Sequence, residues 1–115
     1  MSRAPLSPLF EPPYWAVVFA SQRTAGDQGY GAMAEEMERL VARQPGYLGM
    51  ESARDADGVG ITVAYFRTEA DARAWKQVGR HLEAQRLGRE KWYRGYRVRV
   101  AKVEREYGFA DGENL

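Results

Sequence analysis

Four stretches of the chain have the hydrophobic pattern of β-strands. Residues 14–21 (YWAVVFAS) form a short apolar run with β-branched residues, which is typical of a buried strand. Residues 47–55 and 59–67 lie on either side of the turn sequence DADG, so the pattern predicts a β-hairpin. Residues 96–106 alternate between apolar and basic side chains. The apolar phase slips after Val100, which a β-bulge or an edge position would explain.

Two stretches have the periodicity of amphipathic helices. In residues 30–44, apolar side chains recur at steps of three and four residues, and glutamate and arginine occupy the other faces. Asp27 is the expected N-cap of this helix. Residues 68–78 begin with Thr68 and Asp71 at the spacing of a capping box, which predicts a second helix.

The region after the second helix contains the chain's one histidine. Gly79 should end or bend the helix, and residues 81–92 favour a further helical segment interrupted by a glycine. One face of that segment would carry a polar stripe of His81, Gln85, Gly88 and Trp92. Two interpretations of His81 stay open. It lines a cleft as a proton donor or acceptor, or it is a partly exposed residue bonded to a carbonyl or to a second subunit.

The order β-α-β-β-α-β predicts an α+β fold, the ferredoxin-like sandwich, with a four-stranded antiparallel sheet and helices on one face. Strand 59–67 is apolar on both faces, although helices can cover only one. A second copy of the same sheet is the expected partner, so the sequence predicts a homodimer. The expected division is a proline-rich N-terminal arm, a folded domain and a flexible tail, at residues 1–13, 14–109 and 110–115.

Composition excludes several classes of protein. The chain has no cysteine, which excludes disulfides and thiolate metal sites and fits a cytoplasmic location. With a single histidine, a His-rich metal site within one chain is not expected. The formal net charge of +1 gives no reason to expect nucleic acid as a partner. No apolar run approaches the roughly 18 residues of a membrane-spanning helix, so no membrane partner is expected.

Three segments carry a resemblance to a known family: QPGYLGMES at 44–52, VGITVAYFRTEADARAWK at 59–76, and the run from HLEAQRLGREKWY to AKVEREYGF at 81–109. Over residues 14–109 the chain resembles the antibiotic biosynthesis monooxygenase family, a dimeric α+β barrel group. The resemblance implies a homodimer whose two sheets face each other. It does not imply one reaction, because members include cofactor-independent oxygenases, quinol monooxygenases, haem-degrading enzymes and proteins with no shown activity.

The leading hypothesis from this resemblance is a cofactor-independent monooxygenase acting on a small aromatic phenol or quinol, with no cofactor and no metal. The substrate anion would reduce oxygen itself, so the protein needs a dry aromatic pocket and a stabilising charge. Tyr65 and His81 are the candidates for proton transfer. Arg86 is the candidate for holding the substrate anion, with Arg23 as another available cation. The expected pocket residues are Trp15, Phe19, Ser21, Trp75 and Gln85.

Three alternative functions differ in what they require of the sequence. The haem-degrading branch has a histidine ten residues after the tryptophan that matches Trp75, but Gln85 stands there and His81 is only six residues on. In the basic run 86–105, Arg97 and Arg99 alternate along a strand, as side chains on a solvated face would. This argues against nucleic-acid binding. A non-enzymatic, homodimeric small-molecule binder stays open, since each aromatic taken singly is better explained as a core residue than as part of a pocket. A cavity below about 100 Å³ would contradict the enzyme hypothesis, because ligand sites start near 300 Å³.

Overall fold

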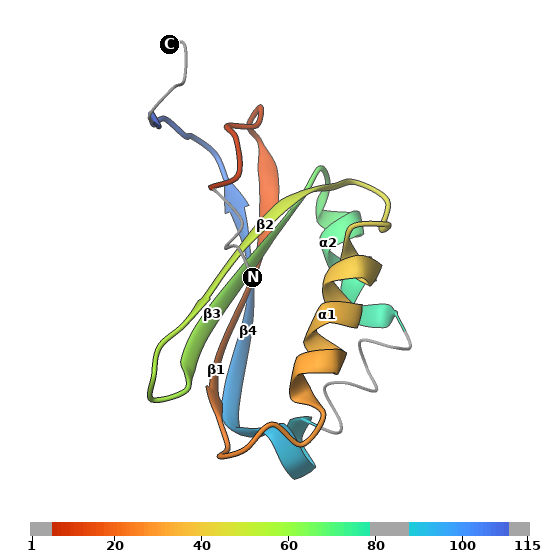
Figure 1. Cartoon of the computed structure of the whole chain (residues 1–115). Coiled ribbons are helices and arrows are strands. Elements are labelled where there is room, and N and C mark those ends of the chain that lie inside the picture. Colours follow the sequence, from red (N-terminus) through yellow and green to blue (C-terminus); the bar gives the residue numbers. More distant parts are fainter. Residues whose placement is uncertain (1–5, 79–87, 111–115) are drawn as a thin grey trace.

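The computed structural model describes residues 6–78 and 88–110. Four strands form one antiparallel sheet in the order β2-β3-β1-β4, and both α-helices lie on the same face of it (Figure 1). The elements along the chain are β1 (Tyr14–Arg23), α1 (Tyr30–Val41), β2 (Tyr47–Arg54), β3 (Val59–Phe66), α2 (Glu69–Gln77), the π-helical turn η1 (Gly88–Trp92) and β4 (Tyr93–Val103). The predicted α+β sandwich is therefore confirmed.

Helix α1 begins and ends differently from the prediction. Its N-cap is Gly29, in the left-handed conformation with a φ of 85°, rather than Asp27. The Asp27 carboxylate instead accepts the backbone N–H groups of Gly29 and Gly31, each at 3.0 Å. The helix stops at Val41 instead of residue 44, since the N–H groups of Arg43 and Gln44 bond three residues back and tighten the chain into a narrower turn.

The second helical region agrees with the sequence where it is described. Thr68 is the N-cap of α2, and its hydroxyl accepts the N–H of Asp71 at 3.0 Å, as the capping-box spacing predicts. The expected helical residues 79–87 lie outside the described part of the chain. After them, η1 leads directly into β4, which begins at Tyr93 rather than residue 96.

The phase slip after Val100 comes from the edge position of β4. Its register against β1 is continuous there, with Ala101 opposite Ala16 and Val103 opposite Tyr14. The irregularity in this pairing lies elsewhere, between Gln22 and Arg23 of β1. The slip therefore moves apolar side chains onto the sheet face that carries no helix.

The core fills the space between the helices and the sheet. Phe66 of β3 is fully buried, and Trp75 of α2 is 6% exposed. They pack with four further buried residues from β1, α1, β3 and α2, namely Val17, Val41, Ala64 and Ala72. Residues of β1 and β3 alternate between this face and the opposite one, so every second side chain of each strand belongs to the core.

The opposite face of the sheet, which we call the open face, is apolar along β1 and β3 and carries Arg97 and Arg99 along β4. The pairs Val18–Val63 and Ala20–Ile61 lie on it, and Ile61 is 50% exposed. The residues before β1 cover one end of this face, where Phe10 contacts the rings of Tyr14 and Tyr65 at 5.3 and 5.5 Å. No helix among the described residues is long and apolar enough to cross a membrane.

Candidate functional site

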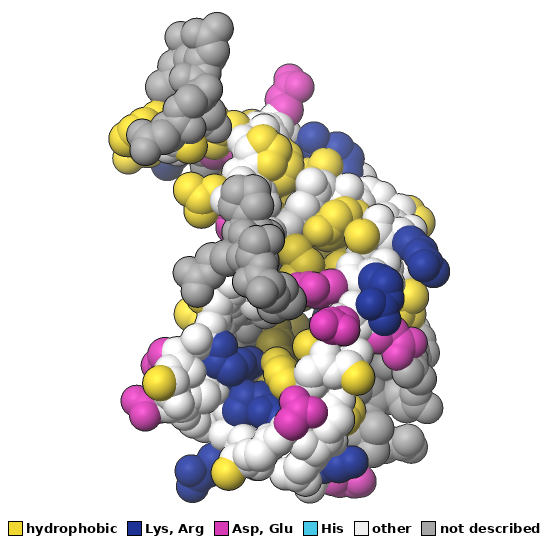
Figure 2. Space-filling model, viewed as in Figure 1, with side chains coloured by type: hydrophobic (Ala, Val, Ile, Leu, Met, Phe, Trp, Pro, Cys, Tyr) yellow, Lys and Arg dark blue, Asp and Glu magenta, His cyan; other side chains and the backbone are white. Residues whose placement is uncertain are grey.

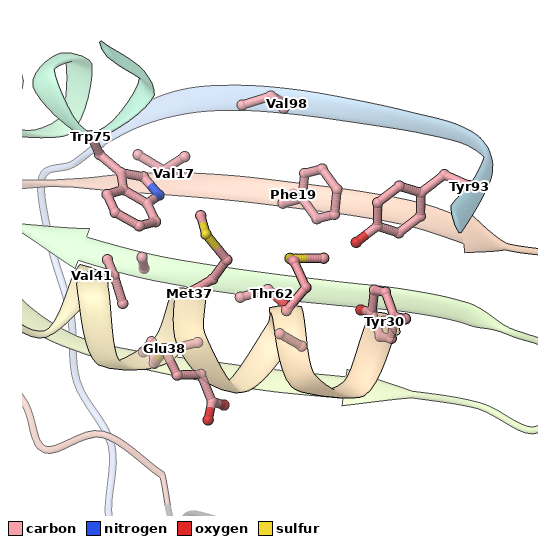
Figure 3. A pocket seen from close by; sticks show the side chains of 14 residues that line it. Val17, Phe19, Tyr30, Met37, Glu38, Val41, Thr62, Trp75, Tyr93 and Val98 are labelled. Carbon is pink, nitrogen blue, oxygen red and sulfur yellow. The ribbon is translucent and has the colours of Figure 1, made fainter. Parts of the chain in front are cut away.

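A cavity of about 130 Å³ lies between the helices and the sheet. Figure 3 shows it lined from several elements, with α1 forming one wall and β1, β3 and β4 the other. Its volume is above the lower limit of about 100 Å³ that the enzyme hypothesis required, but below the roughly 300 Å³ of drug-sized sites. A dry engineered cavity of about 150 Å³ binds benzene, so this cavity matches a single aromatic ring.

Most of the cavity wall is apolar. Three methionines contribute to it, and their flexible thioethers can adjust to the shape of a ligand. The apolar lining residues are Val17, Phe19, Met33, Ala34, Met37, Val41, Met50, Ala64, Trp75 and Val98. Such a wall stabilises an aromatic ring by removing it from water, and it gives little orientation by itself.

Four polar residues also line the cavity, namely Tyr30, Glu38, Thr62 and Tyr93, and Figure 3 shows the Glu38 carboxylate directed away from it. Tyr30 is the first residue of α1 and Tyr93 is the first residue of β4, and their rings meet edge to face at 5.8 Å. Figure 3 shows the Tyr93 hydroxyl directed from the strand toward the cavity. Burial and a hydrogen bond to Tyr30 raise the pKa of Tyr93 far above the ordinary value of 10, so its phenol stays neutral.

Arg54, the last residue of β2, makes a hydrogen bond to one of these tyrosines. The Arg54 Nη2 group donates to the Ser21 hydroxyl at 2.8 Å and to the Tyr30 hydroxyl at 3.2 Å. Its Nη1 group donates to the carbonyl of Gly58. These three contacts fix the guanidinium across the ends of β2, β3 and β1. The buried Ser21, 6% exposed, is thereby an anchor for Arg54.

A second arginine packs on the ring of Tyr30. The Arg23 Cζ atom lies 3.8 Å from the ring centroid, a cation–π contact, and its Nη2 group donates to the carbonyls of Gly26 and Asp27. Among the described residues, the one ion pair within salt-bridge distance joins Arg73 and Glu69, so no described carboxylate neutralises Arg23 or Arg54. This end of the cavity is therefore positively charged and suits an electron-rich or anionic oxygen.

The surface agrees with this distribution of charge. Figure 2 shows a hollow beside α1, with Lys or Arg side chains at its edge and hydrophobic side chains deeper inside. Within the described ranges, no group of three or more Asp, Glu or His side chains could hold a metal ion.

The predicted site residues other than Tyr65 fall into three groups. Phe19 and Trp75 line the cavity. Ser21 lies behind its polar end, and Trp15 packs against the core without lining it. The others, His81, Gln85 and Arg86, lie outside the described residues.

Tyr65 lies on the open face rather than in the cavity. It is paired with Ala16 of β1, and its hydroxyl donates to the Glu51 carboxylate at 2.6 Å. Burial and this hydrogen bond raise the pKa of Tyr65 well above 10, which keeps the phenol protonated. In this position it cannot exchange a proton with a ligand in the cavity.

Sequence reasoning missed the polar end of the cavity. In the sequence, Tyr30 belongs to the predicted amphipathic helix 30–44 and Arg54 to the predicted hairpin strand 47–55, and neither pattern indicates a role in a site. One signal was available, the glycine at position 60 inside the strong strand pattern VGITVAYF. A glycine within a strand marks a close approach by another group. Arg54 is the group that approaches it.

One family model matches more than half of the chain. The sequence profile described as "Antibiotic biosynthesis monooxygenase" matches residues 17–87. The chain is 48% identical over 109 residues to the uncharacterised protein YqjZ of Bacillus subtilis, covering 95% of this chain and 96% of that protein.

Solved structures show the same fold at low sequence identity. SnoaB, a cofactor-independent oxygenase from Streptomyces nogalater, has a TM-score of 0.65 at 13% identity, over 89% of this chain and 96% of that one. Rv0793 from Mycobacterium tuberculosis has a TM-score of 0.70 at 14% identity, over 83% of this chain and 99% of that one.

Proposed function

Because the chain belongs to the antibiotic biosynthesis monooxygenase family, we propose that it is a cofactor-independent monooxygenase acting on a single-ring phenol or quinol. The observation that carries the proposal is the cavity of about 130 Å³, apolar along its walls and phenolic at one end. Its size favours one ring over the fused rings of larger substrates. The proposal places the enzyme in the cytoplasm, in keeping with a cysteine-free sequence.

The proposed chemistry needs no bound redox group. A hydroquinone and dioxygen give a hydroxyquinone and water, with one oxygen atom entering the ring and the other leaving as water. The substrate supplies all the electrons. The protein would bind the ring in a dry site and stabilise the oxyanion, which is the form that donates an electron most readily. The charge of Arg54 and Arg23 near the phenolic end would serve the second purpose.

Oxygen uptake with isotopically labelled dioxygen tests this proposal. With hydroquinone or methylhydroquinone, we expect uptake above the buffer rate and one labelled oxygen in each quinone product. A naphthohydroquinone should react more slowly, because two fused rings exceed the cavity. Autoxidation differs, because it yields unlabelled quinone and hydrogen peroxide. Uptake equal to that of heat-denatured protein, without label in the product, would refute the enzyme and leave the small-molecule binder.

We also propose that two copies pair through their open faces. Ile61, at 50% exposed, lies there beside the apolar pair Val18–Val63. An apolar sheet face of this kind is stable in water only when it is covered. Light scattering at micromolar protein should give about twice the 13.0 kDa chain mass.

A charge on the open face should separate the copies. We expect Ile61→Glu to scatter as a 13.0 kDa monomer, because a buried carboxylate in the interface would be unpaired. Ala70→Glu, at an exposed position of α2, is the matched control and should remain dimeric. A monomeric parent protein, or an unchanged mass for Ile61→Glu, would count against pairing through this face.

A further inference from the structure

Arg54 reaches the cavity across a gap that one glycine creates. Gly60 of β3 is paired with Arg54 on one side and with Ser21 of β1 on the other. A Cβ atom added at Gly60 would lie 2.5 Å from the Arg54 Cζ and 2.8 Å from its Nη2. The guanidinium therefore occupies the space of the missing side chain, and only there can it cross β3 to reach Ser21.

The hydrogen bonds around Tyr30 can be assigned by direction. Arg54 has no acceptor, so it donates to the Tyr30 oxygen. Tyr93 meets the ring of Tyr30 edge to face at 5.8 Å, and burial keeps its phenol protonated, so Tyr93 can donate to the second lone pair of the Tyr30 oxygen. A hydroxyl oxygen has the capacity to accept both hydrogen bonds.

The Tyr30 hydroxyl proton remains available for a ligand. A hydroxyl donates one hydrogen bond, and in its 3.2 Å hydrogen bond with Arg54 the Tyr30 hydroxyl is the acceptor. Tyr30 lines the cavity, and the Arg23 guanidinium against its ring holds the ring in place. A donor that already accepts from a cation is polarised, which strengthens the hydrogen bond it gives.

We propose that the Tyr30 hydroxyl donates the hydrogen bond that holds the oxygen of a phenol or quinol at the polar end of the cavity, and that Arg54, seated over Gly60, positions it. The class of ligand rests on the proposed function. Tyr30 is the binding group, and Arg54 acts through it. The site would bind a phenolate more tightly than a neutral phenol, because Arg54 and Arg23 place positive charge beside the Tyr30 hydroxyl.

Phenol and toluene are the matched probes, because a hydroxyl replaces a methyl group on the same ring. Anaerobic titrations followed by tryptophan fluorescence measure binding without turnover, with Trp75 lining the cavity. The parent protein should bind phenol more tightly than toluene. Tyr30→Phe should weaken phenol binding by about tenfold, near the upper end for one neutral hydrogen bond, and leave toluene binding unchanged. Tyr96→Phe, in ring contact with Tyr93 but outside the cavity lining, should behave like the parent.

Gly60→Ala tests whether the position of the Arg54 guanidinium above Gly60 matters, and it leaves the charge of Arg54 in place. The added methyl group meets the far end of a flexible side chain, so the guanidinium should move and the strand should stay folded. We expect the preference for phenol over toluene to fall about threefold, a loss of roughly half of one hydrogen bond. Gly95→Ala in β4, where a Cβ has nothing within 4 Å, is the matched control. Arg54→Lys should keep most of the preference, and Arg54→Gln should lose it.

The results separate this inference from the proposed reaction. Equal affinity for phenol and toluene in the parent, or binding of neither, overturns the role of Tyr30 even if hydroquinone oxidation is observed. Parallel losses of phenol and toluene binding in Gly60→Ala would assign Arg54 a structural role only. A preference for phenol that depends on Tyr30 and Gly60 supports the inference even when no oxygen is consumed.

Discussion

Replacing Phe66 by alanine should lower the free energy of unfolding by about 3–5 kcal/mol, the range for removing a large buried aromatic side chain. Phe66 is fully buried in the core between the sheet and the helices. Its ring contacts Tyr47 edge to face, with centroids 6.2 Å apart, so the variant also loses an aromatic pair. Because small domains have a stability of about 5–15 kcal/mol, this single change would remove a large part of it.

Urea unfolding followed by circular dichroism measures this effect. Phe109→Ala is the matched control, because Phe109 is 74% exposed and the same atoms are deleted. Its effect should stay within about 0.5 kcal/mol, as for other surface substitutions. If both variants lost similar amounts of stability, the prediction that Phe66 is a central core residue would be contradicted. The proposed pairing of two copies would make the measured value depend on concentration, so both variants are compared at one protein concentration.

The fold could be predicted from the sequence because its signals are local. The period of two in residues 59–66 and the period of 3.6 in residues 30–41 each depend on neighbouring side chains, and both elements form as expected. The order of these elements then leaves few topologies. The ends of the elements could be predicted less precisely than their positions. Helix α1 has Gly29 as its N-cap, in a loop whose hydrogen bonds, such as that from the Gly29 N–H to the Asp27 carboxylate, join residues that are not neighbours.

The candidate site could be predicted only in part, because it depends on contacts between distant residues. Alternation along β3 separates Tyr65 from Ala64, but it does not say which face the helices cover, and Tyr65 lies on the open one. Arg54 reaches Ser21 only when three strands have their observed register. Neither Tyr65 nor Arg54 lies in a local sequence pattern that indicates its place relative to the cavity. Trp75 could be identified because the family resemblance pointed to it.

Filling the cavity from α1 should abolish ligand binding. Ala34 lines the cavity and is half-buried, so Ala34→Phe would place a benzene ring in a space that holds about one such ring. We expect phenol and hydroquinone affinity to fall at least tenfold, because the ligand would have to displace a covalently attached ring. Oxygen uptake should fall to the buffer rate. The folded state should persist, since the introduced ring replaces empty space rather than packed atoms.

Ala32→Phe is the control for this prediction. Ala32 lies two residues earlier in the same helix and is exposed, so the same substitution has the same helix propensity and leaves the cavity open. Its ligand affinity should equal that of the parent. Thermal unfolding verifies that both variants fold, and fluorescence titration with phenol compares their affinities. If Ala34→Phe bound phenol as tightly as Ala32→Phe, the ligand would have to bind elsewhere. The cavity between α1 and the sheet would then not be the functional site, because a ring already occupying it would exclude any other.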